Sequence, residues 1–507
     1  MSLTLGLHRA LQQTPDAVMT VYGRRTRTVR EVAARVARLA GALRDLGVGA
    51  GDRVAMLSLN SDRYHEYLLA VPWAGAVLNP VNIRWSIREI AHSLADSDSR
   101  VVLVDDAFAP LVPGLRERYP QLRTVIHCGD AATPADALSY EDLLDSTDPV
   151  EDARRSGGEL AGLFYTGGTT GFPKGVMLSH TNLVTSALGA AGTGFMYRPG
   201  ARLLHAAPMF HLADLSGWIA VTLLGGTHII VPAFDPVAVL SAIERHRVTE
   251  VLLVPVMIQA LIDHPDLDRH DLSSVRAVLY GASPIARPAL ERAMAALPNA
   301  GFTQAYGMTE LAPIATLLGP DDHRLPGLLS SAGRAAPHAE VRVVGPDGDP
   351  VPTGTVGEVV VRGDAVMLGY WNQPAETRAA LRHGWMHTGD GGYLDENGYL
   401  FIADRIKDMI VSGGENVYSV EVENVIAAHP AVAACAVIGV PDETWGERVH
   451  AVIVRRQGAD VTADEIRAHT KALIAGYKAP RTVDFAESLP VSGAGKVLKR
   501  ELRKRYA

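Results

Sequence analysis

The stretch Tyr165-Thr-Gly-Gly-Thr-Thr-Gly-Phe-Pro-Lys-Gly175 is the most informative part of this 507-residue sequence. It holds four glycines and three threonines between two apolar runs, Leu160–Tyr165 and Val176–Leu178. Such a loop can turn backbone N–H groups and hydroxyls inward, and phosphate is the natural ligand of that arrangement. It is not a Walker A motif, because Pro173 stands where glycine is needed and Gly175 replaces the magnesium-binding Ser or Thr. The stretch therefore predicts a phosphate-binding loop, with a ligand-free tight turn as the alternative.

Outward from this loop, the first half of the chain alternates between helix and strand patterns, which is typical of α/β architecture. Capping boxes at Thr28-Val-Arg-Glu31 and Ser86-Ile-Arg-Glu89 predict two helix starts, and Gly47 ends the first helix. Continuous apolar runs predict strands buried on both faces. These runs are Arg53–Leu59, Val101–Val104, Thr124–His127, Leu203–Ala207, His228–Val231, Val251–Val254 and Val275–Tyr280.

Beyond about residue 335 the pattern changes to short antiparallel strands, with Asn397-Gly398 as a hairpin turn. From Asp408 onward we expect a helix over Val420–Ala428, two strands, a second helix capped at Thr462-Ala-Asp-Glu465 and a last strand. This part is long enough for a separate small domain. The sequence predicts an α/β fold: a large N-terminal domain of α/β sheet layers with a small β-rich subdomain, then a small α+β domain.

Composition excludes several classes of protein. The chain is 47% hydrophobic and 21% charged, and its net charge of −8 provides no overall basic field for nucleic acid or anionic lipid. Two cysteines, Cys128 and Cys435, cannot build a disulfide framework and suit a reducing compartment. No apolar run reaches the ~18 residues that span a bilayer, and the first residues do not resemble a signal peptide. We expect a cytoplasmic protein.

The loop at 165–175 resembles the phosphate loop of the adenylate-forming superfamily, which includes acyl-CoA synthetases, adenylation domains of peptide synthetases and beetle luciferases. The resemblance covers nearly the whole chain, with the motifs in the family's order. One position departs from it: Gly167 stands where the family usually has Ser, which removes one hydroxyl contact to phosphate. The ATP- or AMP-binding residues implied in this loop are Thr166, Gly168, Thr169, Thr170, Gly171 and Lys174.

Two further segments resemble the rest of the nucleotide site. Gln304-Ala-Tyr-Gly-Met-Thr-Glu310 resembles the segment that stacks adenine on Tyr306, places Thr309 near the α-phosphate and holds Mg²⁺ through Glu310. Tyr280-Gly-Ala-Ser283 resembles the backbone wall beside the adenine, at a strand end where open α/β sheets bind ligands. The nucleotide-binding residues implied here are Gly281, Ala282, Ser283, Gln304, Ala305, Tyr306, Gly307 and Met308.

Ribose and acyl contacts are implied by two shorter motifs. Thr388-Gly-Asp390 resembles the turn whose aspartate accepts both ribose hydroxyls, and Arg405 resembles the second ribose contact. Ala207-Pro-Met-Phe-His211 resembles the segment whose histidine shapes the acyl pocket. A lone histidine is more often structural, and the chain has no HExxH or CxxC spacing that would make it a metal ligand.

Leu489-Pro-Val-Ser-Gly-Ala-Gly-Lys496 resembles the family's closing motif, in which Lys496 bridges the substrate carboxylate and the α-phosphate. Negative charge builds on the transferring group, so a positioned cation stabilises the transition state. With Lys496, catalytic roles are implied for Glu310, Thr309 and His211. The basic residues that follow are expected on a solvated helix face: Lys499, Arg500, Arg503, Lys504 and Arg505.

The resemblance also divides the chain. Residues 1–404 are expected to form the large domain that binds the adenylate and the acyl group, 405–407 the hinge at Lys407, and 408–507 a small mobile domain that carries Lys496. Rotation about the hinge would withdraw Lys496 after adenylation. The same rotation would bring the implied CoA-binding residues to the acyl site: Ser412, Gly413, Gly414 and Glu415.

Together these motifs imply an ATP-dependent carboxylic acid–CoA ligase that uses Mg²⁺ and CoA, forms an acyl-adenylate and releases AMP and pyrophosphate. The residues after His211 are mostly small or apolar, and no arginine directly follows Gln304. Both features favour a hydrophobic acid, whether fatty, aryl or a bulky specialised metabolite, over a dicarboxylate. The expected partners are small molecules, without nucleic acid, and a homodimer stays open.

The main alternative keeps the adenylation and transfers the acyl group to a carrier-protein thiol. Asp214 lies close to the segment where amino-acid-selecting domains carry an aspartate for the ammonium group, so an amino acid stays open as the substrate. A luciferase-like oxidase has no specific support. A protein that binds adenylate without catalysis is disfavoured, because four residues of the catalytic set are all present: Glu310, Asp390, Arg405 and Lys496.

Overall fold

The structure is a computed structural model that describes residues 1–167, 172–283, 285, 287–405, 408–412, 415–442, 444–491 and 497–506, with the backbone alone at Asp404, Arg405 and Asn416. The chain divides into two compact units. The first unit consists of Met1–Pro284, Glu291–Val341 and Val361–Met386. The second consists of Ile285–Leu290, Arg342–Val360 and His387–Ala507.

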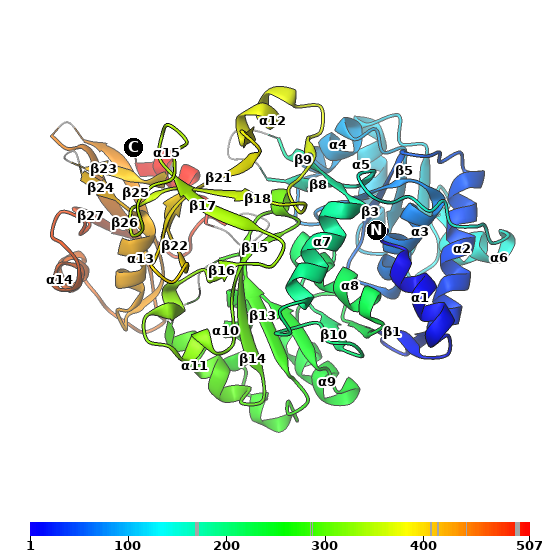
Figure 1. Cartoon of the computed structure of the whole chain (residues 1–507), viewed down its shortest axis with the longest axis horizontal. Coiled ribbons are helices and arrows are strands. Elements are labelled where there is room, and N and C mark those ends of the chain that lie inside the picture. The colour runs from blue at the N-terminus through cyan, green and yellow to red at the C-terminus, as the bar shows by residue number, and fades with distance from the viewer. Residues whose placement is uncertain are drawn as a thin grey trace. The chain divides into compact units, whose positions relative to one another are not determined.

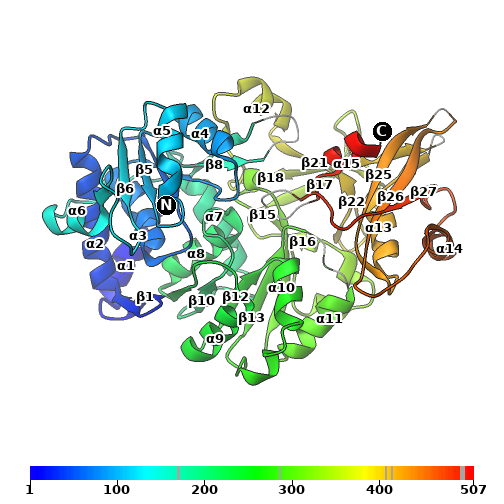
Figure 2. The same cartoon turned by 180° about the vertical axis from the view of Figure 1, so that it is seen from behind.

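An eight-stranded sheet forms one half of the first unit. Its strands, in spatial order, are β19 (Gly369–Tyr370), β9 (Lys174–Ser179), β8 (Leu160–Thr166), β4 (Val77–Pro80), β3 (Arg53–Leu57), β5 (Val101–Val104), β6 (Thr124–His127) and β7 (Leu138–Ser139). Strands β3 to β6 and β8 run parallel where they pair, whereas β9 and β19 are antiparallel to their neighbours. The helices of this half are α2 (Val29–Asp45), α3 (Asp62–Ala74), α4 (Ile87–Asp96), α5 (Val112–Arg118) and α6 (Tyr140–Ser146). Helices α4 and α5 bury their apolar residues against β3, β5 and β6 (Figure 2).

A nine-stranded sheet forms the other half. Its order is β16 (Arg334–Ala335), β15 (Ile314–Leu318), β14 (Gly301–Gly307), β13 (Ala277–Gly281), β12 (Glu250–Leu253), β10 (Arg202–His205), β11 (Thr227–Ile230), β1 (Val18–Tyr22) and β2 (Arg25–Thr28). The remaining helices are α1 (Leu5–Gln13), α7 (His180–Ala191), α8 (Leu212–Leu224), α9 (Pro236–His246), α10 (Pro255–Ile262), α11 (Arg287–Ala296) and α12 (Pro374–Ala380). Helices α7 and α8 pack against each other, α7 contacts β9, and α8 contacts β10 and β11, so this pair fills the space between the two sheets (Figure 1).

The remaining described strands form two smaller sheets. One contains β17 (Glu340–Val344), β18 (Gly357–Arg362), β21 (Trp385–Leu394) and β20 (Leu381–Arg382) in that order, with β22 (Leu400–Arg405) paired to β21. The other contains β24 (Glu415–Val417), β23 (Ile410–Ser412), β26 (Gly446–Arg455) and β25 (Val432–Asp442), with β27 (Thr482–Phe485) paired to β26. Its helices are α13 (Ser419–Ala427), α14 (Ala463–Leu473) and α15 (Lys499–Tyr506).

Local sequence signals account for most of these elements. Glu31 N donates to Thr28 Oγ1 while Glu31 Oε2 accepts from Thr28 N, so the predicted capping box begins α2, and Gly47 follows the helix with a φ of +84°. The boxes at Ser86 and Thr462 are confirmed in the same way. The α/β class is confirmed, whereas the domain boundaries at 404 and 408 stay predictions. Among the described residues, no helix is both long and apolar enough to cross a bilayer.

The expectation of a fully solvated basic tail is wrong at two positions. Lys499 Nζ lies 2.8 Å from Glu423 Oε1, and its side chain is 14% exposed. Arg503 NH1 lies 2.8 Å from Asp408 Oδ1. The same helix buries Leu502 against residues of β25 and β26. Helix α15 is therefore a packed element of the second unit, because partly buried charges on it are paired with carboxylates.

Candidate active site

Two of the predicted nucleotide segments lie side by side at the carboxyl ends of β13 and β14. These strands are parallel, and Gly281 stands opposite Ala305. A Cβ atom at residue 281 would overlap the carbonyl oxygen of Ala305, so glycine is required there. The next residue, Ala282, has a left-handed φ of +65° and turns the chain away from the sheet. The structure thus brings 281–283 and 304–308 to one edge of the sheet, as ligand sites of open α/β sheets require.

Behind this edge, a buried tyrosine–histidine hydrogen bond lies beside the predicted site residue Gln304. The Tyr280 hydroxyl lies 2.8 Å from His323 Nε2 and 3.3 Å from Gln304 Oε1. Burial lowers the pKa of His323, which keeps the imidazole neutral at pH 7. Its Nδ1 lies 2.7 Å from the carbonyl oxygen of Gly319, so Nδ1 carries the proton and Nε2 accepts from Tyr280. Because the phenol has one proton and donates it to His323, Gln304 Oε1 lies beside the Tyr280 hydroxyl without receiving a hydrogen bond from it.

Glu310 lies just beyond β14, in the short 3₁₀ helix Thr309–Leu311, and it is 5% exposed. The Tyr370 hydroxyl donates to Glu310 Oε1 across 2.7 Å, and the backbone N–H of Met367 donates to the Glu310 carbonyl oxygen across 2.9 Å. Tyr370 belongs to β19, which pairs with β9. A residue of the eight-stranded sheet therefore fixes the carboxylate that follows a strand of the nine-stranded sheet.

The base of the phosphate loop lies close to Tyr370 as well. Thr166 and Lys174 are opposite each other on β8 and β9, so they close the base of the loop. Lys174 Nζ lies 2.5 Å from Glu376 Oε2 and 5.4 Å from the centre of the Tyr370 ring. The residues at the tip, Gly168, Thr169, Thr170 and Gly171, lie outside the described residues. The base of the loop and Glu310 therefore meet at one tyrosine ring.

One carboxylate beside the base of a phosphate loop suits a hard cation that takes most of its ligands from a bound phosphate group. Within the described ranges, no group of three or more His, Cys, Asp or Glu side chains could hold a metal by itself. Mg²⁺ commonly uses one or two carboxylates together with phosphate oxygens. Glu310, with Lys174 and the loop base nearby, fits that mode of binding.

The acyl-pocket residue His211 stands at the N-terminus of α8, half-buried, with its ring 4.2 Å from that of Phe210. Asp214, one turn later, is 2% exposed, and its Oδ2 lies 2.7 Å from His205 Nδ1. His205 Nε2 in turn lies 2.9 Å from His228 Nδ1. The Asp214 carboxylate is therefore engaged inside the core, which removes the feature that kept an amino-acid substrate open.

In the second unit, the two predicted ribose contacts are paired across strands. Asp390 on β21 stands directly opposite Arg405 on β22. Asp390 is 7% exposed, and its N–H donates to Thr388 Oγ1, whose own hydroxyl donates to the carbonyl of Val359. Of Arg405 only the backbone is described, and Lys407 lies outside the described residues.

Of the predicted CoA-binding residues, Ser412 and Glu415 are opposite each other on β23 and β24. Ser412 Oγ is buried and has no hydrogen-bond partner among the described residues, whereas Glu415 is exposed. The glycines between them, Gly413 and Gly414, and the predicted catalytic Lys496 lie outside the described part of the chain.

Sequence reasoning missed Tyr370 and Glu376. Tyr370 follows Gly369 and precedes Trp371. Such a short aromatic stretch is typical of residues packed in a hydrophobic core. The role of Tyr370 depends on a contact with Glu310, which lies sixty positions earlier in the chain and follows a strand of the other sheet. No local spacing carries that information.

Comparison with known proteins agrees with this geometry. The family model of AMP-binding enzymes matches residues 7–371, and that of the AMP-binding enzyme C-terminal domain matches residues 421–496. A feruloyl-CoA synthase of Amycolatopsis sp is 42% identical, with 98% of each chain covered. The fatty acid–[acyl-carrier-protein] ligase ScoC of Streptomyces coeruleorubidus is 36% identical, with 99% of this chain and 96% of that protein covered.

A solved structure of o-succinylbenzoate CoA synthetase (MenE) from Bacillus subtilis, in complex with its acyl-adenylate intermediate, has a TM-score of 0.87 and 31% identity, covering 99% of this chain and 98% of that chain. The agreement confirms mixed α/β sheets in a large N-terminal domain followed by a smaller C-terminal domain. It also supports the use of ATP. The chain belongs to the family of AMP-binding enzymes, the adenylate-forming superfamily that its motifs resemble.

Proposed function

We propose that this protein is an ATP-dependent carboxylic acid–CoA ligase that works through an acyl-adenylate. The observation that carries the proposal is the meeting of Glu310 and Lys174 on Tyr370. This contact places a carboxylate for a hard cation next to the base of the phosphate loop. Both lie beside the strand ends that would line the adenine. The relatives named above include enzymes that ligate acids to CoA.

In the first half-reaction, a carboxylate oxygen of the acid attacks the α-phosphorus of ATP and the bond to pyrophosphate breaks. The loop that begins at Thr166 and ends at Lys174 would bind the phosphate oxygens. Glu310, oriented by Tyr370, would hold Mg²⁺, which neutralises phosphate charge when bound. Lys496 would stabilise the charge that develops between the two anions.

In the second half-reaction, the CoA thiolate attacks the carbonyl carbon of the acyl-adenylate, and AMP leaves with the bonding electrons. Ser412 and Glu415, with the two glycines between them, would line the approach of the thiol. The switch between half-reactions would depend on rotation about Lys407. Asp390 and Arg405 would hold the ribose through both steps.

The acid is hydrophobic, and an aryl acid is the best-supported class. His211 precedes a helix whose first turns are apolar apart from Asp214, and that carboxylate is bonded to His205. No free charge from this segment is therefore offered to a second carboxylate or to an ammonium group. Similarity to a feruloyl-CoA synthase supports an aromatic acid in particular.

A carrier-protein thiol is the second candidate acceptor, favoured by the similarity to ScoC. CoA is better supported, because two of the three relatives described above carry CoA in their names. A cytoplasmic location and a homodimer stay predictions.

The experiment is pyrophosphate release with ATP, Mg²⁺ and a panel of acids: hydroxycinnamates, benzoates, medium-chain fatty acids and malonate. We expect release with hydrophobic acids and not with malonate, and AMP release that depends on added CoA. Glu310→Gln is the inactive control. Transfer to a carrier protein without transfer to CoA would establish the second candidate, and absence of release with every acid would contradict the proposal.

A further inference from the structure

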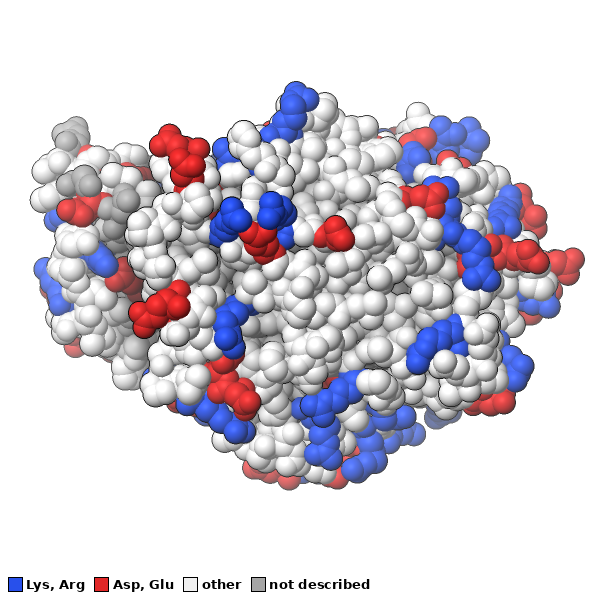
Figure 3. Space-filling model, in the orientation of Figure 1, with Lys and Arg blue, Asp and Glu red and all other residues white. Residues whose placement is uncertain are grey.

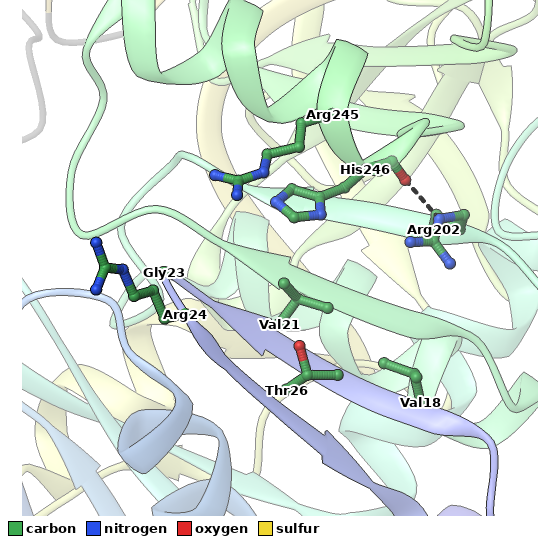
Figure 4. A pocket seen from close by; sticks show the side chains of 8 residues that line it. All are labelled: Val18, Val21, Gly23, Arg24, Thr26, Arg202, Arg245 and His246. Carbon is green, nitrogen blue, oxygen red and sulfur yellow. Dashed lines mark hydrogen bonds between the residues drawn. The ribbon is translucent and has the colours of Figure 1, made fainter.

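A hollow lined by arginines lies between α9 and the hairpin of β1 and β2. Its volume is about 540 Å³, and Arg24, Arg202, Arg245 and His246 line it together with Val18, Val21, Gly23 and Thr26 (Figure 4). An adjoining hollow of about 500 Å³ shares Arg202, Arg245 and His246 and adds Arg247, Thr249, Ser274 and Arg276. We call the two together the basic hollow. Figure 3 shows Lys and Arg side chains gathered where Figure 1 places α9.

The basic hollow is separate from the candidate active site. Arg202 begins β10, and Thr249 and Arg276 directly precede β12 and β13, so all three lie at the amino edge of the nine-stranded sheet. The nucleotide segments at Gly281 and Ala305 lie at the carboxyl edge. Residues at opposite ends of these strands cannot share one small ligand, because a strand residue advances ~3.3 Å.

The arginines of the basic hollow come from separate parts of the chain. Arg24 belongs to the β1–β2 turn, Arg245 and Arg247 to the end of α9, and Arg202 and Arg276 to strand edges. The hydrogen bonds from Arg202 N to Thr249 Oγ1 and from Arg276 N to the Thr249 carbonyl place these residues on three neighbouring strands. Two strand spacings separate the backbones of Arg202 and Arg276 by ~10 Å.

Four of the five arginines that line the basic hollow form no ion pair with a described carboxylate. None of the residues that line it is acidic. In the described part of the chain, Arg24, Arg245 and Arg276 form no ion pair, and Arg202 Nε donates to the carbonyl oxygen of His246 across 2.6 Å. Arg247 is paired, 3.5 Å from Asp271. Partial burial lowers the pKa of His246, and the charges of Arg245 and Arg202 lower it further.

Elsewhere in the same unit, arginines that meet in one place are neutralised by carboxylates. Arg35 and Arg63 share Glu141, and Arg35 also bonds Glu66. The helix dipole accounts for basic residues at the end of α9, such as Arg245. It does not account for Arg24, Arg202 and Arg276, which lie on other elements.

We propose that the basic hollow binds a soluble anion that carries two or more phosphate groups. Guanidinium groups bind phosphate oxygens through paired N–H donors. Several guanidiniums carried by separate elements favour a ligand with more than one anionic group. The volume lies in the range of small-molecule sites. The proposal goes beyond the ligase reaction and does not depend on it.

The test is calorimetric titration of the full-length protein with inorganic triphosphate at low salt. Arg245→Gln with Arg276→Gln removes two charges from the basic hollow. Arg123→Gln with Arg456→Gln is the matched control, because both arginines are exposed and form no ion pair within the described ranges. The candidate active site also binds phosphates, so we expect two binding events in the wild type. The hollow variant should weaken one event at least tenfold, and the control should change neither.

Two further measurements keep the outcome decisive. Unchanged pyrophosphate release by the hollow variant would show that the variant is folded. If no acid supports release, the titration still measures triphosphate binding at the basic hollow. Sedimentation with vesicles of phosphatidylcholine and phosphatidylglycerol separates a soluble ligand from a lipid surface. Vesicle binding lost in the hollow variant without a change in triphosphate binding would overturn the proposal. Equal triphosphate binding by the hollow and control variants would overturn it too.

Discussion

The phenol of Tyr370 donates a hydrogen bond to Glu310 across 2.7 Å, and the ammonium of Lys174 lies 5.4 Å from the centre of the same ring. Tyr370 thereby contacts both the base of the phosphate loop and the carboxylate proposed to hold Mg²⁺. Because Glu310 is buried, its orientation depends on the groups that bond it. Tyr370 is a positioning residue in this scheme, since it acts through Glu310.

Tyr370→Phe should lower the adenylation rate by about 10- to 100-fold, because a hydrogen bond to a charged group contributes ~1.5–3 kcal/mol. The loss should appear together with a raised Mg²⁺ requirement in the pyrophosphate-release assay, while KM for the acid stays constant. A structural defect alone would not move the Mg²⁺ dependence. Tyr393→Phe is the control, because that phenol stacks on Phe401 in the second unit and should tolerate the change. Equal Mg²⁺ dependence in both variants would show that Tyr370 does not position the carboxylate.

Lys496→Ala should reduce the rate of acyl-adenylate formation by ~10²–10³-fold or more, because removing one positioned electrostatic contact to a transition state lowers the rate by that factor. Thioester formation from supplied acyl-adenylate should persist, since the second half-reaction does not need this lysine. Lys504→Ala is the matched control: that lysine is 57% exposed and pairs with Glu501 on the same helix. Equal loss of both half-reactions in Lys496→Ala would disprove the assignment.

Gly167→Ser should raise kcat/KM for ATP by up to about tenfold, because one added hydrogen bond contributes ~0.5–1.5 kcal/mol. A Cβ at this position meets no described atom within 4 Å, and its φ lies outside the left-handed region, so serine causes no strain. Gly158→Ser adds the same side chain in open space away from the loop and should leave the kinetics unchanged. A tenfold loss in Gly167→Ser would show that this loop requires glycine.

Acid should destabilise the protein through its buried histidines. Burial lowers the pKa of His65 to about 3 and that of His180 to about 4. The unfolded chain binds these protons near pH 6.5, and the folded chain does not bind them until the lower pKa is reached. Stability is therefore complete above pH 6.5 and falls as the pH decreases toward 4, by ~1.4 kcal/mol per pH unit for each histidine.

His65→Gln tests this contribution, because a glutamine carbonyl can replace the ring nitrogen that accepts the hydrogen bond from Trp218 Nε1. Its melting temperature, followed from pH 7 to pH 4.5, should fall less steeply than that of the wild type. His383→Asn, at an exposed position with a left-handed φ of +53° that asparagine tolerates, should follow the wild type. Identical slopes for all three proteins would contradict the prediction.

The parts of the fold that depend on neighbours in sequence were predictable. Capping boxes at Thr28, Ser86 and Thr462 begin helices as expected, because they satisfy backbone donors within four residues. Strand positions were right to within one to three residues, as with β10, predicted at 203–207 and observed at Arg202–His205. Their ends depend on pairing with other strands, which no single segment specifies.

The contacts that complete the site could not be read from the sequence. The motifs identify Glu310 and Lys174 individually, and nothing local shows that Tyr370 joins them. Asp214 looked available to a substrate until the structure placed His205 against it. In each case the residue that forms the contact comes from another element of the fold. The type of functional group was therefore predictable from the sequence, and its hydrogen-bond partner was not.

The pairing of β1 with β11 has a consequence for synthesis on the ribosome. Thr20 of β1 pairs with His228 of β11, about 200 residues later in the chain. At ~5–20 residues per second, the N-terminal hairpin is made ~10–40 s before its neighbour emerges. During that interval Met19 and Val21, which the finished protein buries, have no sheet to join. A nascent chain stalled before residue 227 should therefore expose the hairpin to proteases and chaperones, and release past that point should protect it.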